Sequence, residues 1–280
     1  MVADADLASG ATIYMGSFIW AIEAAVNNAE YLGANAGDEL VLVANTKASG
    51  TDATADAAGA TQVDSNVAVF TLKGETITSC VMDAIQAKAS FDTKGVAAEI
   101  ADPAVLTKAQ LGEAYGLKAY SGVGKEWNEQ TAAFCEYITG KTLEEVKGIA
   151  LTETTAPAEA DLAASVSIAV GDFMALVEKA GNSAVDTNEQ VKTGFAVSAT
   201  LSAESAGEKD GSSTTDVSLV AVTVTEDGVI ESCAIDAIQG KVTFDGSGKV
   251  TSEAGAVLSK KELGDDYGMR VASPIGKEWD

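Results

Sequence analysis

The chain of 280 residues contains no histidine. This absence excludes catalytic triads built on an imidazole, imidazole metal ligands and the usual imidazole proton shuttle. Cysteine is scarce as well, since the sequence has only three. Two of them, Cys80 and Cys233, stand at matching places in two similar stretches, so we expect no disulfide framework.

Basic residues are also few. The sequence has 18 Lys and Arg against 42 Asp and Glu, which gives a formal net charge of −24. Nucleic acids and anionic membranes bind clustered Lys and Arg, so we expect neither as a partner. The best apolar run, residues 13–26, contains Glu23 and is too short to span a bilayer. No basic segment follows Met1, so we expect no signal peptide, and an exported protein would correspond to a mature portion.

Three stretches of the sequence occur twice, in the same order. The stretch DLASGATIYMGSFIWAIEAAV resembles the later DLAASVSIAVGDFMALVEKA, SCVMDAIQAK resembles SCAIDAIQGK, and LGEAYG with GKEW resembles LGDDYG with GKEW. The copies lie about 150 residues apart, a spacing that is too long for a solenoid and indicates a duplicated unit.

Each unit has the same predicted order of elements. Apolar residues at helical spacing predict helices at 13–29 and 168–180. In the first unit, strands at 40–45 and 67–72 flank a polar loop at 49–65, and a tight turn leads to a third strand with Cys80. A last helix is expected from about residue 126 to 140, followed by a short turn capped by Thr142. This order predicts an α+β fold, an antiparallel sheet with helices packed on one side, in duplicate.

If each repeat unit begins at its first strand, the chain divides into three parts. Residues 1–39 would be the turn and helix of a preceding or swapped unit, residues 40–185 a complete domain, and residues 186–280 a second domain that is incomplete at its C-terminal end. The segment around Pro157 is the best candidate for a linker.

A turn of small residues precedes the first predicted helix, with the pattern D-x-x-S-G-A-T at residues 6–12. The simplest interpretation is a helix cap by Ser9 or Thr12. The start of a helix also attracts phosphate, because its free N–H groups and the positive end of its dipole point outward.

The same pattern resembles the flavinylation motif of the FMN-binding domain family. That family occurs in subunits of the Rnf and sodium-pumping NADH:quinone reductase complexes, and in electron-transfer lipoproteins of Gram-positive bacteria. The resemblance implies that a flavin transferase links FMN covalently, through its phosphate, to the hydroxyl of Thr12. The rest of the motif would be Asp6, Ser9, Gly10 and Ala11.

The second copy of this motif departs from the family pattern. Its matching positions include Asp161, Ser165, Val166 and Ser167, so Gly, Ala and Thr have become Ser, Val and Ser. Ser167 still offers a hydroxyl to the phosphate, whereas the bulkier turn makes recognition by the transferase less favourable.

Further residues are candidates for contact with the flavin ring, each with a structural alternative. An aromatic side chain in a glycine-flanked loop can stack on the ring or pack on its own domain, and a glutamine can bond the polar edge of the ring or lie free on the surface. These candidates are Tyr115, Gly116, Tyr267, Gly268, Gln86 and Gln239.

Other polar and aromatic residues favour structural roles. Trp127 and Trp279 are expected to anchor the last helix, and Lys125 to be a solvated charge. Asp83 and Asp236 have no evident partner carboxylate, so we assign no catalytic residue and no metal ligand.

The resemblance implies an extracellular, membrane-anchored electron carrier on the cell surface, rather than a catalyst. Its partners would be the flavin transferase and a redox protein or a small extracellular acceptor. The alternatives are a cofactor-free structural or interaction repeat of the same fold, and a flavin-dependent reductase. Because the first motif lacks a half-domain before it, it could dock onto residues 190–280 of a neighbouring chain, which would give head-to-tail self-association.

Overall fold

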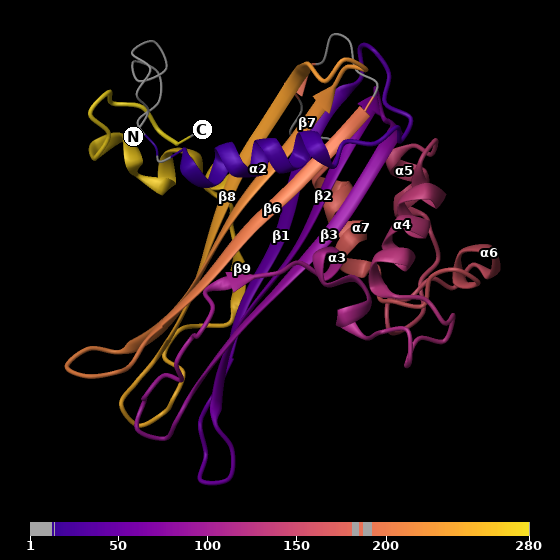
Figure 1. Ribbon diagram of the computed structural model, residues 1–280. Coiled ribbons are helices and arrows are strands. Elements are labelled where there is room, and N and C mark those ends of the chain that lie inside the picture. Colours follow the sequence, from indigo (N-terminus) through magenta and orange to yellow (C-terminus); the bar gives the residue numbers. More distant parts are fainter. Residues whose placement is uncertain (1–12, 14, 181–184, 187–191, 280) are drawn as a thin grey trace.

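Two antiparallel sheets lie face to face, and helices cover the outer face of each sheet (Figure 1). The computed structural model describes residues 13, 15–180, 185–186 and 192–279. The first sheet has the order β3-β2-β1-β5, with β9 also paired to β1, and the second has the order β4-β6-β7-β8. The predicted α+β class with antiparallel sheets is therefore confirmed.

The first half of the described chain holds one sheet and most of the helices. Its elements are α2 (Gly16–Asn27), β1 (Glu39–Thr51), β2 (Gly59–Lys73), β3 (Thr76–Phe91), β4 (Ala104–Val105), α3 (Lys108–Leu111), η1 (Gly112–Tyr115), α4 (Trp127–Ile138), α5 (Leu143–Lys147), α6 (Ala160–Ala163) and α7 (Gly171–Ala180).

The second half also has three long strands followed by short helices, and duplication of one unit stays a prediction. Its elements are β5 (Val185–Asp186), β6 (Lys192–Glu204), β7 (Gly211–Val224), β8 (Ile230–Phe244), β9 (Gly255–Val257), α8 (Lys260–Leu263), η2 (Gly264–Tyr267) and η3 (Met269–Val271).

The central core lies between the two sheets. Leu40, Val67 and Ile85 of the first sheet pack against Leu219 and Ile238 of the second, and all five are almost fully buried. Side chains alternate between the two faces of a strand, so the remaining apolar residues of each strand face outward. Those outward residues form two further cores with the helices.

The two longer helices that pack on the outer faces near the cavities, α2 and α7, both come from the first half of the described chain but cover different sheets. Helix α7 packs on β1 and β2, whereas α2 packs on β6 and β7 of the same chain. Helix α2 buries Phe18, Ala21 and Ala25, a spacing that places all three on one face. The completion that we expected from a neighbouring chain is thus made within the chain, and self-association stays a prediction.

Contacts between the two halves come in matching pairs. The rings of Phe91 and Phe244, which end β3 and β8, stack in parallel with centroids 4.0 Å apart. The N–H of Ala53 donates to the carbonyl of Gly248 (2.8 Å), and the N–H of Ala206 donates to the carbonyl of Gly95 (2.7 Å). The short strands are exchanged too, because β9 pairs with β1 and β4 pairs with β6.

The strands are longer than the sequence pattern predicts. The expected polar loop at 49–65 is mostly strand, with only a short turn between Thr51 and Gly59. Small residues are needed in this region because neighbouring side chains pack closely over the strand ends. A Cβ on Gly59 would lie 2.4 Å from the ring of Phe91. The low hydrophobicity of residues 49–65 therefore reflects small residues in closely packed strands. The prediction of a polar loop there was wrong.

Two helix starts also differ from expectation, since α2 begins at Gly16 and α7 at Gly171. The amides of Ser167 and Ile168 donate to the side chain of Gln130 and so take no part in α7. The last helix of the first half is confirmed as α4, and Thr142 caps α5 in a capping box with Glu145.

The Pro157 segment is not a boundary between packed bodies. Leu151 and Pro157 form a β-bridge, and Leu162 and Val166, which follow, belong to the same core as α4 and α7. The prediction of a linker there was wrong.

Candidate functional site

Two cavities occupy equivalent places on the outer faces of the two sheets. The first cavity has a volume of about 320 Å³ and lies between the first sheet, α3 and the start of α7. Strands β1 to β3 present mainly polar side chains to it. Its lining is Asn45, Lys47, Asp64, Asn66, Ala84, Ile85, Gln86, Lys108, Trp127, Ala169, Asp172 and Phe173.

The second cavity has a volume of about 610 Å³ and lies between the second sheet, α8 and the start of α2. Its residues match the first set by their places in the strands and helices. It includes Asp216, Ala237, Ile238, Lys260 and Trp279, together with Ile13, Ser17 and Phe18 from the N-terminal end.

A lysine lies among aromatic rings in each cavity. The ammonium of Lys108 is 5.3 Å from the ring centroids of both Tyr115 and Trp127. The ammonium of Lys260 is 4.9 Å from the Tyr267 centroid and 5.8 Å from the Trp279 centroid. A cation over an aromatic face is stabilised by the ring's quadrupole, which holds each lysine in place.

Each tryptophan also contacts a phenylalanine from the covering helix. The Trp127 and Phe173 centroids are 6.0 Å apart, and the Phe18 and Trp279 centroids are 6.1 Å apart, both with an interplanar angle of 52°. The start of α7 or α2 is thereby fixed against the wall of its cavity. Trp127 and Trp279 were predicted from the sequence as anchors, whereas Lys108 and Lys260 were not predicted to have a role.

A hydrogen-bonded Asp–Gln pair lies on the strands of each sheet. Nε2 of Gln86 donates to Asp64 (2.8 Å), and Nε2 of Gln239 donates to Asp216 (2.7 Å). Gln86 lines the first cavity directly, whereas Gln239 reaches the second only through Asp216. These are the predicted ring-contact residues that the structure brings closest to the cavities.

Ser167 is exposed and lies four residues before the first residue of α7. Its N–H donates to Oε1 of Gln130 (2.7 Å), and its hydroxyl lies 3.2 Å from the same oxygen and 3.3 Å from the Ser121 hydroxyl. It therefore does not cap α7. Two residues further on, Ala169 lines the first cavity, whereas Ser167 itself is not part of the lining.

Of the other residues in the two copies of the motif, those of the second copy are described in the structure and those of the first copy are not. Asp161 is exposed on α6, and Ser165 is half-buried in the turn that follows it. Asp6, Ser9, Gly10, Ala11 and Thr12 lie outside the described residues.

The predicted tyrosines occupy matching turns but unequal positions. Tyr115 ends η1 and packs on the core under α4, outside the lining of the first cavity. Tyr267 ends η2 and lines the second cavity. Gly116 (φ 77°) and Gly268 (φ 75°) follow them in the left-handed conformation, where a side chain would be strained. The two glycines have a turn-forming role.

Asp83 and Asp236 support the lysine-bearing helices. The Asp83 carboxylate accepts the N–H groups of Ala84 (2.7 Å) and Ala109 (3.1 Å), and Asp236 accepts those of Ala237 (2.7 Å) and Lys261 (3.2 Å). Burial raises the pKa of both carboxyls, and the hydrogen bonds lower it in part. Each therefore fixes the start of α3 or α8.

Within the described residues, no group of three or more His, Cys, Asp or Glu side chains could hold a metal ion. The same part of the chain contains no helix that is both long and apolar enough to cross a membrane. No family model matches the sequence, and neither a curated protein nor a solved structure matches it.

Proposed function

We propose that the chain is a duplicated flavin-binding electron carrier, with one FMN ring in each of the two equivalent cavities. The observation that carries the proposal is the pairing itself. Two separate places in the fold present the same set of an Asp, a Lys, a Trp and a Phe beside the same kind of turn and helix. The two linings share an Asp and a Lys as well as aromatic residues, which packing alone does not require. We therefore expect the two cavities to bind the same ligand.

The residues of the first cavity fit the polar edge of a flavin. Because Nε2 of Gln86 already donates to Asp64, its Oε1 is left as an acceptor for the ring's imide N–H. Asn45 and Asn66 line the same cavity and offer amide donors to the ring's carbonyls. Volumes of about 320 and 610 Å³ lie in the range of small-molecule pockets.

The cofactor would supply one- or two-electron redox chemistry, and the protein would hold and tune it. Lys108 would place a positive charge beside the flavin of the first cavity, and Lys260 beside that of the second. A nearby positive charge favours the anionic reduced form of the flavin. The chain's net charge of −24 opposes reduction wherever acidic groups lie within a Debye length of the ring.

Covalent attachment would use the hydroxyl of Ser167 for the first ring, and that of Thr12 for the second. Ser167 is exposed, so a flavin transferase can reach it without unfolding the core. Its present partner is the neutral side chain of Gln130, whose NH₂ group could turn to donate to a phosphate oxygen. On a cell surface, the carrier would pass electrons to a redox protein or a small acceptor.

The test is co-expression of the full chain with a flavin transferase, followed by intact mass and absorbance spectra. We expect an added mass of FMN less one water, on a peptide that contains Ser167. Ser167→Ala should remove this adduct, and Ser165→Ala, a change in the same turn, should keep it. A wild-type chain that stays colourless and unmodified would overturn the proposal and favour the cofactor-free repeat.

A further inference from the structure

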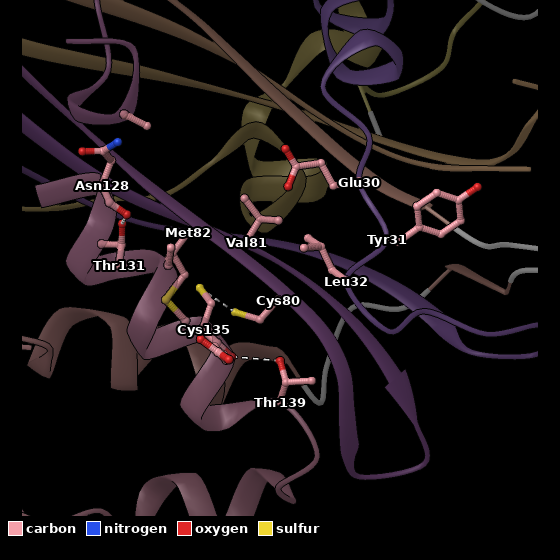
Figure 2. A pocket seen from close by; sticks show the side chains of 13 residues that line it. Glu30, Tyr31, Leu32, Cys80, Val81, Met82, Asn128, Thr131, Cys135 and Thr139 are labelled. Atoms are coloured by element: carbon pink, nitrogen blue, oxygen red, sulfur yellow. Dashed lines mark hydrogen bonds between the residues drawn. The ribbon is translucent and has the colours of Figure 1, made fainter. Parts of the chain in front are cut away.

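A third cavity lies at the free edge of β3, away from the two cavities described above. It has a volume of about 570 Å³ and is enclosed by β3, α4 and the segment that follows α2 (Figure 2). Its lining is mostly apolar and includes Leu32, Val81, Met82 and Ala132. Two of the three cysteines of the chain, Cys80 and Cys135, are also part of this lining.

The two thiols meet at the boundary between β3 and α4. Figure 2 shows their sulfur atoms pointing toward each other, with an Sγ–Sγ distance of 3.2 Å. Cys80 is 5% exposed and Cys135 is 6% exposed, and both line the cavity, so a small molecule in the cavity can reach them. Cys233, at the place that matches Cys80, is exposed and free, and so it provides an internal comparison.

We propose that Cys80 and Cys135 form a dithiol–disulfide redox site that reacts with small disulfides entering this cavity. One thiolate attacks a small disulfide, RSSR, and releases one RSH, which leaves a mixed disulfide on the protein. The second thiolate then attacks the protein sulfur of this mixed disulfide, and its S–S bond breaks to release the other RS group, which is protonated to RSH. The two cysteines are oxidised, RSSR is reduced, and both thiol protons end on the two RSH products.

The geometry requires only a small movement. The sulfur atoms must close from 3.2 Å to about 2.05 Å, the length of a disulfide. Both residues lie on regular elements that already pack together, so rotation about the side-chain bonds can supply this change. The cross-link would join the edge of the first sheet to its largest covering helix.

The charge around the cavity selects the kind of disulfide. The titratable groups that line it, besides the thiols, are Glu30, Tyr31 and Glu136, and no Lys or Arg is part of the lining. Outside the lining, the ammonium of Lys192 lies 5.0 Å from the ring centroid of Tyr31. The two carboxylates of the lining and the net charge of −24 nevertheless disfavour anionic reagents and favour uncharged or cationic ones. Burial also raises the pKa of the Cys80 thiol well above its usual value, and its hydrogen bond with Cys135 adds to this. The thiolate is therefore scarce at neutral pH, and the reaction should be faster in alkaline solution.

The first experiment oxidises the full chain carrying Cys233→Ser with cystamine, a cationic disulfide, at about pH 8.5, the usual thiol pKa. The protein is then denatured and alkylated, and its intact mass is measured. We expect a product that has lost two hydrogen atoms, carries no alkyl group and yields a cross-linked peptide of Cys80 and Cys135. Its thermal unfolding midpoint should rise by about 5–10 °C, because the cross-link closes a long loop. Two alkylated thiols, or a mixed disulfide that persists, would overturn the proposal.

Single variants and a charge reversal complete the test. Cys80→Ala and Cys135→Ala should each prevent the loss of two hydrogen atoms. Cystamine should react at least about tenfold faster than an aromatic dicarboxylate disulfide, after each rate is divided by that for free cysteine. Glu136→Lys should narrow this ratio severalfold, and Glu144→Lys, a control outside the cavity, should leave it unchanged. Equal rates for the two reagents would contradict the assigned substrate class.

Discussion

Helix α2 provides the sharpest test of the fold, because its docking within the chain was not expected. Phe18 is its main anchor. The side chain is 5% exposed and packs against Trp279 in the core on the outer face of the second sheet. Truncation to alanine removes this buried ring and leaves a cavity in a core made largely of Ala and Val.

The expected cost of Phe18→Ala is about 3 kcal/mol, at the low end for a buried phenylalanine. Phe173 is its counterpart on α7, is 3% exposed and contacts both Trp127 and Phe134. The additional aromatic pair is worth about 0.5–1.5 kcal/mol, so Phe173→Ala should cost about 4 kcal/mol. Ile19→Ala, on the same helix as Phe18 but at a side chain that is 61% exposed, should cost less than about 0.5 kcal/mol.

Urea unfolding of the three variants, followed by circular dichroism at several protein concentrations, measures these costs. Because α2 docks on its own chain, the midpoints should not depend on concentration. A cost below about 1 kcal/mol for Phe18→Ala would mean that the helix is not anchored as described. A midpoint that rises with concentration would mean that a second chain supplies the contact, and would refute intrachain docking.

Two further predictions concern the strand ends and the buried carboxyls. Gly59→Ala should destabilise the protein by about 2 kcal/mol or more, because its Cβ would lie 2.4 Å from the Phe91 ring, whereas Gly246→Ala, in open space, should change the unfolding midpoint little. Burial raises the pKa of Asp83 above 3.8, so the folded state binds the proton more tightly than the unfolded state and stability falls as pH rises through the window just above 3.8. Asp83→Asn should flatten that part of the pH–stability curve, and an unchanged slope would show that another group causes it.

The sequence predicted the elements whose signals are local. Helix α4 and the cap at Thr142 follow from helical spacing and from the capping box with Glu145, and both were predicted. The third strand of each half follows from β-rich runs after tight turns. These features depend on a few neighbouring residues, so the chain itself carries the information.

The features that the sequence did not predict depend on contacts between distant residues. Gly59 is small because Phe91 lies over it, and Gly240 because Val63 does, and neither neighbour is evident from the surrounding sequence. The loop prediction at 49–65 failed for this reason. Lys108 was missed as well, since only the folded chain brings it over Trp127 and beside Gln86.

The two cavities have some features of the candidate site in common and differ in others. In the first, Lys47 forms an ion pair of 2.9 Å with Asp172 on α7. In the second, the matching positions hold Thr200, which pairs with β7 as Lys47 pairs with β2, and Ser17 on α2.

An opposite-charge pair has thus been replaced by two hydroxyls, which leaves the net charge of the cavity unchanged. What remains in both is one Asp–Gln pair, one lysine over aromatic rings and one Trp–Phe contact. The turn before the helix, by contrast, differs between the copies at four of its seven motif positions. A ligand common to both cavities would therefore be recognised by the charge and the aromatic rings of the cavity wall, and the turn would decide only whether that ligand is attached covalently.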